Sequence, residues 1–342
     1  MRAAVFHEFG GPEQVRIEDV PTPSPAPGEV LVRVRACALN RLDLWVLGGL
    51  PGLRTPLPFW TGSDIAGEVA ELGPGVLGVT AGMRVALNPG LWCGTCEWCI
   101  QGEESLCVRY RLIGEHTVGG LAEYVAVPAP NLLVLPDNVS FEAAAAFILV
   151  NMTAWRMLVT QAALRPAENL LILGVGGGVS SAAVQIGKLG GARVFVTSSS
   201  DEKLRRARAL GADDGVNYAV TDWTRAVQEW TGRRGVDVVL DNVGAVTWAS
   251  SLRCLARGGR LVTCGATTGP IGETDIRTLF WRQLRIIGST MSNRKEFRDV
   301  MGQLFAGRLQ AIIDRTFPFE ETSAALALLQ KGEQFGKLVI RM

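Results

Sequence analysis

The stretch LLILGVGGGVSSAAVQIGKLG, residues 170–190, reads as a short apolar strand, a glycine-rich turn and a helix. The strand is expected over Leu170–Leu173, and the turn runs through Gly174–Ser180. A helix N-terminus at such a turn offers unpaired backbone N–H groups and a partial positive charge to a pyrophosphate. The literal G-x-G-x-x-G pattern is absent, because Ser180 stands where the third glycine would be. Taken alone, the turn also fits an ordinary tight turn, so its surroundings decide the interpretation.

Three more strand-like segments follow this turn, in the order ARVFVTSSS (192–200), VDVVLDNVG (236–244) and GRLVTCGA (259–266). A helical stretch, DEKLRRARALGAD (201–213), separates the first two. Repeated β–α units form a parallel sheet that binds its ligand at the carboxyl ends of the strands. The sequence therefore predicts an α/β dinucleotide-binding domain, in which the pyrophosphate contacts the turn residues Gly176, Gly177, Gly178 and Val179.

The end of the second strand indicates which dinucleotide is bound. An NAD site places Asp or Glu there to accept hydrogen bonds from the ribose hydroxyls. This chain has Ser198 and Ser199 instead, which leave room for a 2′-phosphate and can donate to it, and Lys203 follows on the next helix. We therefore predict NADP(H), with NAD(H) as the alternative.

A cysteine-rich lobe, CGTCEWCIQGEESLC (93–107), lies earlier in the chain. Four thiolates that converge on one point suit a closed tetrahedral zinc. A bacterial ferredoxin run has three residues before its last cysteine and a proline after it, whereas here seven residues precede it and Val108 follows. An iron–sulfur cluster and free or redox-active thiols are the alternatives. A four-thiolate zinc has no open position for substrate, so we predict one structural Zn²⁺ held by Cys93, Cys96, Cys99 and Cys107.

Length and charge limit the classes of function. The chain has 342 residues, which suggests about two domains, and a formal net charge of +1. A charge so close to zero creates no long-range field that would favour nucleic acid or an anionic membrane. The N-terminal residues show no apolar core of signal-peptide length. We expect a cytoplasmic protein whose partner is a small molecule.

Taken together, these segments resemble the medium-chain dehydrogenase/reductase superfamily. The motifs that carry the resemblance are ACALNRLD (36–43), GSDIAGEV (62–69), the cysteine lobe, GGLAEY (119–124), NMTAW (151–155), the glycine turn, DNVG (241–244), IIGSTM (286–291) and FGKLVI (335–340). The resemblance implies a GroES-like catalytic β domain formed by residues 1–149 and 288–342, with a zinc lobe at 88–110. It also implies a Rossmann doubly wound parallel sheet over residues 150–287, with the nicotinamide held between the two domains.

The chain departs from the zinc alcohol dehydrogenases of this superfamily, which hold a second, catalytic zinc through Cys, His and Cys or an acidic residue. The matching positions here carry Asn40, Ser63 followed by Asp64, and Leu149, and the proton-relay position carries Leu42. A shifted alignment through Cys37 would restore one ligand, but neither His7 nor His116 lies in a matching motif. No catalytic zinc is expected, and a weak, unusual metal site at Asp43 and Asp64 is the alternative.

The catalytic half instead resembles the quinone oxidoreductase branch, which has Asn-x-x-Asp where this chain has Asn40 and Asp43. That branch reduces quinones or activated carbon–carbon double bonds with NADPH, and it usually lacks a four-cysteine lobe. The chain therefore combines two patterns. The resemblance also implies cofactor contacts: Arg41 and Lys337 on the pyrophosphate, Lys203 and Tyr218 on the 2′-phosphate, and Thr153, Val243, Gly265 and Ala266 beside the nicotinamide.

The expected reaction is hydride transfer from NADPH to a carbon activated by conjugation with a carbonyl. Asn40 would donate a hydrogen bond to the enolate oxygen, while Asp43 and Asp64 would position Asn40 or a water. The alternatives are an alcohol dehydrogenase and a non-catalytic NADPH-binding protein. The strand-like RIIGSTM (285–291) resembles a strand that pairs across a two-fold axis, so we expect a homodimer or homotetramer.

Overall fold

The computed structural model describes all 342 residues, which divide into two compact units. The β-rich unit comprises residues 1–149 and 293–342, and the Rossmann unit comprises residues 150–292. The sequence analysis placed the boundaries after residues 149 and 287. The second follows Ser292 rather than residue 287, because the chain still pairs with the Rossmann sheet at Ser289, whose N–H donates to the carbonyl of Thr263.

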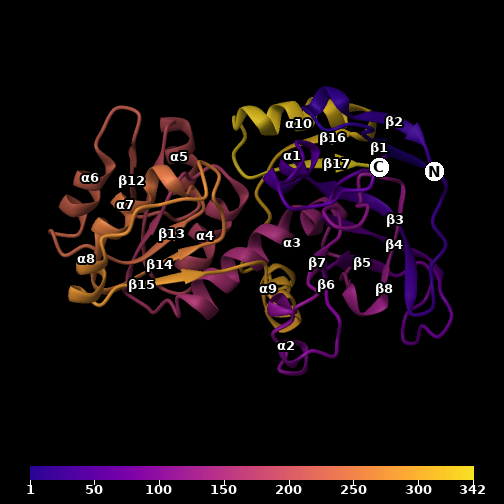
Figure 1. The fold of residues 1–342 in the computed structure, drawn as a ribbon, viewed down its shortest axis with the longest axis horizontal. Coiled ribbons are helices and arrows are strands. Elements are labelled where there is room, and N and C mark those ends of the chain that lie inside the picture. Colours follow the sequence, from indigo (N-terminus) through magenta and orange to yellow (C-terminus); the bar gives the residue numbers. More distant parts are fainter. The chain divides into compact units, whose positions relative to one another are not determined.

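The Rossmann unit contains a six-stranded, entirely parallel sheet in the order β12-β11-β10-β13-β14-β15 (Figure 1). Its strands are β10 (Asn169–Ile172), β11 (Arg193–Ser198), β12 (Asp214–Asn217), β13 (Val236–Asp241), β14 (Leu255–Thr263) and β15 (Arg285–Gly288). Its helices are α4 (Gly178–Leu189), α5 (Asp201–Ala209), α6 (Trp223–Trp230), α7 (Ala245–Cys254) and α8 (Ile276–Trp281). The strand order reverses between β10 and β13, which is where such sheets bind dinucleotides.

The apolar runs of the sequence become the buried central strands of this sheet. All four residues of β10 are buried, and Leu171, Phe195, Val239 and Leu261 belong to one apolar core. The strand β12 was not predicted, since its sequence, DGVN, carries no apolar run and all four residues are only partly buried at the sheet edge. Edge strands need fewer apolar residues than central ones, because only part of their surface is covered.

The β-rich unit contains a seven-stranded sheet in the order β16-β17-β3-β4-β5-β9, with β8 also paired to β3. The strands of the whole β-rich unit are β1 (Arg2–Val5), β2 (Arg16–Asp19), β3 (Glu29–Ala38), β4 (Asp64–Leu72), β5 (Arg84–Leu87), β6 (Gly90–Leu91), β7 (Arg111–Leu112), β8 (Tyr124–Pro128), β9 (Leu132–Val134), β16 (Ile313–Pro318) and β17 (Lys337–Arg341). Its helices are α1 (Arg41–Leu47), α2 (Glu97–Ile100), α9 (Arg294–Phe305) and α10 (Thr322–Lys331), with short 3₁₀ turns at Pro12–Gln14, Glu104–Leu106, Ala129–Asn131 and Phe319–Glu321.

The register of three neighbouring strands positions the candidate catalytic residues. Ala38, the last residue of β3, pairs with Asp64 at the start of β4 and with Val339 of β17. Asn40 lies two residues beyond Ala38, and Lys337 lies two residues before Val339. The same edge of the sheet therefore brings Asn40, Asp64 and Lys337 together from distant parts of the sequence.

Helix α3 (Phe141–Trp155) continues into a π-helical segment at Arg156–Gln161 and begins in one unit and ends in the other. By length and composition, Phe141–Gln161 could cross a membrane, but 72% of its most apolar window is buried inside the protein. Such burial is typical of a core helix.

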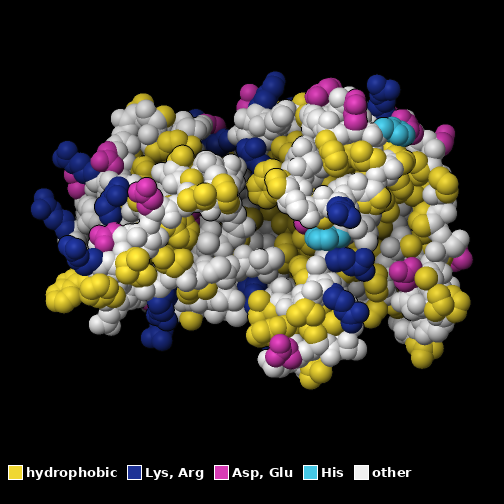
Figure 2. Space-filling model, in the orientation of Figure 1, with side chains coloured by type: hydrophobic (Ala, Val, Ile, Leu, Met, Phe, Trp, Pro, Cys, Tyr) yellow, Lys and Arg dark blue, Asp and Glu magenta, His cyan; other side chains and the backbone are white.

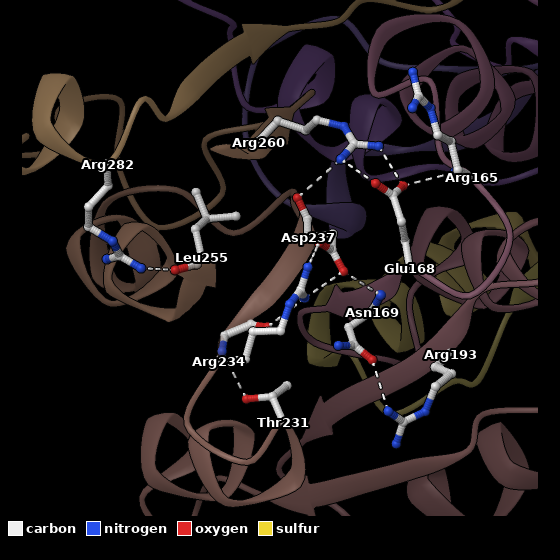
Figure 3. Close-up of polar contacts among 11 residues, drawn as sticks. Arg165, Glu168, Asn169, Arg193, Thr231, Arg234, Asp237, Leu255, Arg260 and Arg282 are labelled. Carbon is white, nitrogen blue, oxygen red and sulfur yellow. Dashed lines mark hydrogen bonds and ion pairs between the residues drawn. The ribbon is translucent and has the colours of Figure 1, made fainter. Parts of the chain in front are cut away.

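A polar network joins the amino ends of the Rossmann strands (Figure 3). Arg260 of β14 holds the carboxylate of Glu168 through two parallel bonds, Nη1 to Oε1 at 2.9 Å and Nη2 to Oε2 at 2.6 Å. Asp237 of β13 accepts from the Asn169 N–H at 2.9 Å and from Arg234 at 2.6 Å. This network lies at the end of the sheet away from the carboxyl ends of the strands, so its role is structural.

Candidate functional site: a zinc lobe, a dinucleotide turn and a buried lysine

The four lobe cysteines lie together in the β-rich unit. Their sulfur atoms all lie within 4.8 Å of one another, with Cys93 and Cys99 at 3.9 Å and Cys96 and Cys99 at 3.6 Å. Zinc–sulfur bonds of about 2.3 Å in a tetrahedron place sulfur atoms about 3.8 Å apart. The spacing and the all-sulfur donor set therefore fit one zinc ion held by Cys93, Cys96, Cys99 and Cys107.

Backbone N–H groups surround these sulfur atoms. Those of Thr95 and Cys96 point at the sulfur of Cys93 and lower the pKa of its thiol to about 5. Burial raises the pKa of the Cys99 thiol to about 12, so a bound cation would be needed to make it a thiolate. Helix α2 and the turn Glu104–Leu106 hold the lobe's short segments, and Glu104 pairs with Arg294 of α9 at 2.7 Å.

The glycine turn between β10 and α4 leaves the helix N-terminus open to a ligand. Gly177 is the N-cap of α4 and supplies no side-chain hydrogen bond to the first turn. Gly176 has a φ of +134°, which favours glycine, and the hydroxyl of Ser180 donates to the Leu173 carbonyl at 3.0 Å. Ser180 thus ties the helix to the strand where a third glycine would otherwise allow close packing.

The residues predicted to contact a 2′-phosphate gather at the carboxyl end of β11. Ser198 is buried in the last position of the strand, and its carbonyl accepts from the Tyr218 N–H at 2.9 Å. Ser199 is exposed, and Ser200 caps α5 by accepting from the Lys203 N–H at 3.4 Å. The Lys203 side chain runs beside the glycine turn, since a Cβ on Gly176 would lie 2.7 Å from its Cδ. The structure therefore places the Lys203 side chain beside the glycine turn, and Ser198 and Tyr218 next to each other at the ends of β11 and β12.

Buried Asp241 joins the end of β13 to the start of α7, and the sequence analysis did not identify it. Its Oδ1 accepts from the N–H groups of Val243 and Gly244, at 2.8 and 3.0 Å. Its Oδ2 accepts from the hydroxyls of Thr247 and Ser251, at 2.9 and 3.0 Å. The motif DNVG contains this signal, because an Asp at a strand end often hydrogen-bonds the backbone two residues on.

The residues expected beside the nicotinamide do not form one cluster of mutual contacts within the Rossmann unit. Gly265 lies 3.1 Å from the Asn242 carbonyl, measured from the position that a Cβ would take. Ala266 is exposed after β14, whereas Thr153 is buried in α3 and its hydroxyl lies 3.9 Å from the sulfur of Met291. Their roles toward a nicotinamide stay predictions.

Asn40, Asp64 and Lys337 form a buried cluster in the β-rich unit, and Asn40 is the one of the three at a position that the resemblance assigns to a catalytic zinc ligand. The Lys337 ammonium donates to Asn40 Oδ1 at 2.5 Å and to Asp64 Oδ2 at 2.7 Å. Asn40 Nδ2 also donates to Asp64 Oδ2, at 2.9 Å, and the backbone N–H of Leu149 donates to Asp64 Oδ1 at 2.6 Å. The exposed fractions are 7% for Asn40, 0% for Asp64 and 3% for Lys337. A cation, an anion and an amide thus satisfy one another here.

This arrangement differs from the expectation for Lys337, which the resemblance places on the pyrophosphate. Its ammonium is directed at Asn40 and Asp64 in the interior of the unit. Arg41, the other expected pyrophosphate contact, is exposed, and one of its terminal nitrogens lies 3.2 Å from where a Cβ on Gly332 would be. Both pyrophosphate contacts stay predictions.

Asp43 makes backbone contacts rather than contacts to the Asn40 side chain. Its two oxygens accept from the N–H groups of Asn40, at 2.7 Å, and Gly62, at 2.9 Å. Burial raises the pKa of its carboxyl to about 6, against the effect of these hydrogen bonds. Asp43 therefore fixes the N-terminus of α1 and the loop before β4, and it positions Asn40 through the backbone.

Both histidines are engaged elsewhere. His7 pairs with Glu18 at 2.9 Å on the surface, and the Nδ1 of His116 accepts from the Leu112 N–H at 3.2 Å. An imidazole whose nitrogen already accepts a backbone hydrogen bond cannot use that nitrogen as a metal ligand.

Comparison with known proteins agrees with the fold. Residues 26–137 match the alcohol dehydrogenase GroES-like domain, and residues 178–306 match the zinc-binding dehydrogenase domain. The NAD-dependent alcohol dehydrogenase of Sulfolobus acidocaldarius is 33% identical over 349 residues and covers 100% of both chains. The crotonyl-CoA reductase of Streptomyces avermitilis is 31% identical over 366 residues, which span 95% of this chain and 81% of the reductase. A crystal structure of an NAD-dependent alcohol dehydrogenase is 44% identical, covers 100% of both chains and superposes with a TM-score of 0.96.

The chain therefore belongs to the medium-chain dehydrogenase/reductase superfamily, with the GroES-like and Rossmann domains that the sequence predicted. It is an NAD(P)-dependent oxidoreductase of the zinc-type alcohol dehydrogenase group. Its relatives include enzymes named for two different reactions, so membership alone does not identify the substrate.

Proposed function

We propose that this protein transfers a hydride from NADPH to an activated carbon–carbon double bond, as in an enone or a quinone, without a catalytic zinc. The observation that carries this proposal is the cluster of Asn40, Asp64 and Lys337, since an amide stands at a metal-ligand position and its oxygen accepts from an ammonium of the chain itself. Conjugate reduction needs a hydrogen-bond donor at the developing enolate oxygen rather than a Lewis acid. The crotonyl-CoA reductase among the relatives supports this reaction class.

Residues of the Rossmann unit would bind the cofactor, and residues of the β-rich unit would act on the substrate. The α4 N-terminus would hold the pyrophosphate, and Ser198, Lys203 and Tyr218 would hold the 2′-phosphate. NADPH, when bound, supplies the hydride. In the β-rich unit, Asp43 and Asp64 fix the position of Asn40, and the cluster around Asn40 would supply the donor for the substrate oxygen. The zinc held by the four cysteines would stabilise the lobe and take no part in the reaction.

A zinc-independent alcohol dehydrogenase, which interconverts alcohols with aldehydes or ketones, is the second candidate. The names of several relatives that match over the full chain favour it. The discriminating experiment follows NADPH absorbance with a matched set consisting of an enone, its saturated ketone and a benzoquinone. We expect the enone or quinone to be reduced at least about tenfold faster than the ketone, because conjugation stabilises the developing charge. Faster turnover of the ketone would favour the alcohol dehydrogenase.

Lys203→Ala tests the cofactor prediction. A charge-assisted hydrogen bond contributes about 1.5–3 kcal/mol, so this variant is expected to weaken NADPH binding by about 10–100-fold. Binding of NADH should change little. Fluorescence titration measures both affinities, and Arg205→Ala on the same helix, where Arg205 pairs with Glu202, is the matched control. Equal loss of NADH and NADPH affinity would contradict a role on the 2′-phosphate.

We also propose that the protein is a homodimer that pairs through β15. This strand is one of the two edge strands of the Rossmann sheet, and the apolar side chains Ile276, Phe280 and Trp281 on the neighbouring α8 are exposed. Figure 2 shows apolar side chains gathered over α8. Paired edges in an oligomer protect such strands from uncontrolled association.

Ile286→Glu places a charge on this edge and is expected to convert the dimer to monomers, because two carboxylates would meet across a two-fold axis. Light scattering after size-exclusion chromatography measures the mass. Ile271→Glu, at an exposed apolar residue outside any strand, is the control and should leave the dimer intact. A dimer that survives Ile286→Glu would show that another surface forms the interface.

A further inference from the structure

The Lys337 ammonium donates to the side chain of Asn40, which stands at a ligand position of the zinc-dependent relatives, yet the reaction outlined above assigns Lys337 no role. Asn40 and Leu149 stand at two of the three ligand positions, and Asp64 follows Ser63, which stands at the third. Asn40 and Asp64 accept from the cation, and the Leu149 N–H donates to Asp64. Asn40 and Asp64 therefore bind a fixed positive charge that the chain itself supplies. The remaining question is whether that charge only satisfies Asp64 or also acts on the substrate.

The hydrogen bonds of the Lys337 ammonium favour a role toward the substrate. An ammonium has three N–H donors. Two of those on Lys337 are used, by Asn40 Oδ1 and Asp64 Oδ2. Asp64 is fully buried and also accepts from Leu149 and Asn40, so it serves as a fixed anchor for the cation. The third N–H is the donor left for a ligand oxygen.

The hydrogen bonds of the neighbouring Asn40 amide also favour Lys337 as the donor to the substrate. Asn40 Oδ1 accepts from Lys337 and its Nδ2 donates to Asp64 and, at 3.4 Å, to the Ala38 carbonyl. Both ends of the amide are therefore occupied by the cluster, which makes Lys337 rather than Asn40 the donor with spare capacity. Preorganised donors in a water-excluded site stabilise developing negative charge far more than they would in water.

We propose that Lys337 is the catalytic electrophile, whose ammonium binds the carbonyl oxygen of the substrate and then protonates it. This inference rests on the proposed reductase function and adds a residue to it. As the nicotinamide is oxidised, the hydride forms a C–H bond at the β-carbon of an enone. The electron pair of the C=C bond then moves to join the α-carbon to the carbonyl carbon, and the C=O π pair moves onto the oxygen. One N–H bond of Lys337 breaks as the O–H bond of the enol forms.

The cycle closes without any further reagent. The lysine is left as a neutral amine hydrogen-bonded to Asp64 and Asn40, and it regains a proton from solvent. The enol returns to the saturated ketone in solution. For a quinone, the same proton converts the hydroquinone monoanion to hydroquinone. Unlike a zinc ion, the lysine thus supplies both the positive charge and the proton.

The test uses a double variant, Lys337→Met with Asp64→Asn, because the methionine alone would leave a buried carboxylate without its cation. Relative to wild type, kcat for the enone or quinone is expected to fall by about 10²–10³-fold, the usual effect of losing one oxyanion donor. NADPH affinity should stay within about threefold, a change below about 1 kcal/mol. Asp64→Asn alone, which keeps the ammonium, should retain more activity than the double variant. Lys331→Met on α10, where the lysine is exposed, is the control.

A second readout works without turnover. 4-Nitrophenol carries an oxygen like that of a hydroquinone and absorbs differently as phenol and phenolate. With NADP⁺ present, wild type is expected to bind it and to ionise more of it at a fixed pH than the double variant does. If wild type reduces neither enones nor quinones, the proposed function fails, and this titration still decides the role of Lys337. Equal ionisation by the two proteins would overturn that role. Unchanged kcat, or a loss confined to NADPH affinity as expected of a pyrophosphate contact, would overturn it as well.

Discussion

Cys99→Ser is expected to remove the zinc from the chain, lowering the content from about one ion per chain to nearly none. Cys99 is buried, and its sulfur lies within 4 Å of those of Cys93 and Cys96, so no other side chain can take its place. A serine hydroxyl stays protonated at neutral pH and is a poor zinc ligand. The lobe should then unfold locally, because α2 and the turn Glu104–Leu106 have only four and three residues and helices this short are not stable without other constraints.

Elemental analysis of protein purified without added metal measures the zinc content, and limited proteolysis detects the loosened lobe. Cys264→Ser, outside the cluster, is the matched control and should keep its zinc. One zinc per chain remaining in Cys99→Ser would contradict the four-thiolate site. Two zinc ions per wild-type chain would contradict the interpretation of the Asn40 cluster, since its ammonium and a divalent cation cannot occupy one place.

The sequence predicted those parts of the protein whose functional residues lie close together along the chain. The glycine turn of residues 174–180 and the cysteine spacing of residues 93–107 each lie within one short segment. Such motifs need only one turn or one loop to bring their residues together. The fold class followed for the same reason, because the β–α alternation is visible along the chain.

The sequence could not show that Lys337 contacts Asn40 and Asp64, because these contacts depend on the register of the sheet. Lys337 is 297 residues from Asn40 and 273 from Asp64. Only the pairing of β17 with β3, and of β3 with β4, aligns the three residues. A shift of one residue in either pairing would turn the Lys337 or Asp64 side chain to the opposite face.

The stabilising network at the amino ends of the Rossmann strands was missed for a related reason. Glu168 precedes its strand by one residue and Arg260 lies 92 residues later, with no motif that connects them. Asn169, Asp237 and Arg234 look like ordinary polar residues at strand starts or in turns. Their pairing becomes visible only when the parallel strands lie side by side (Figure 3).

That network leads to a second large expected effect. Glu168→Gln should lower the free energy of unfolding of the Rossmann unit by about 3–5 kcal/mol, because it leaves the Arg260 guanidinium buried without its counter-charge. The side chain of Arg260 is 7% exposed and that of Glu168 is 20% exposed. The remaining hydrogen-bond partners of Arg260 are the neutral carbonyls of Ala162, Ala163 and Asp237, and the nearby Asp237 carboxylate is already paired with Arg234. Urea-induced unfolding of the variant and the wild type measures the difference.

Glu202→Gln is the matched control, since Glu202 pairs with Arg205 on the surface with side chains 60% and 67% exposed. Exposed pairs contribute about 0–1 kcal/mol, so the control should unfold nearly as the wild type does. NADPH affinity should be unchanged in Glu168→Gln, because the cofactor site is expected at the carboxyl ends of the strands and the network lies at the amino ends. A loss of stability together with a loss of affinity would show that the two ends of the sheet are coupled, whereas an unchanged unfolding midpoint would mean that the Arg260–Glu168 pair contributes no more than a surface pair.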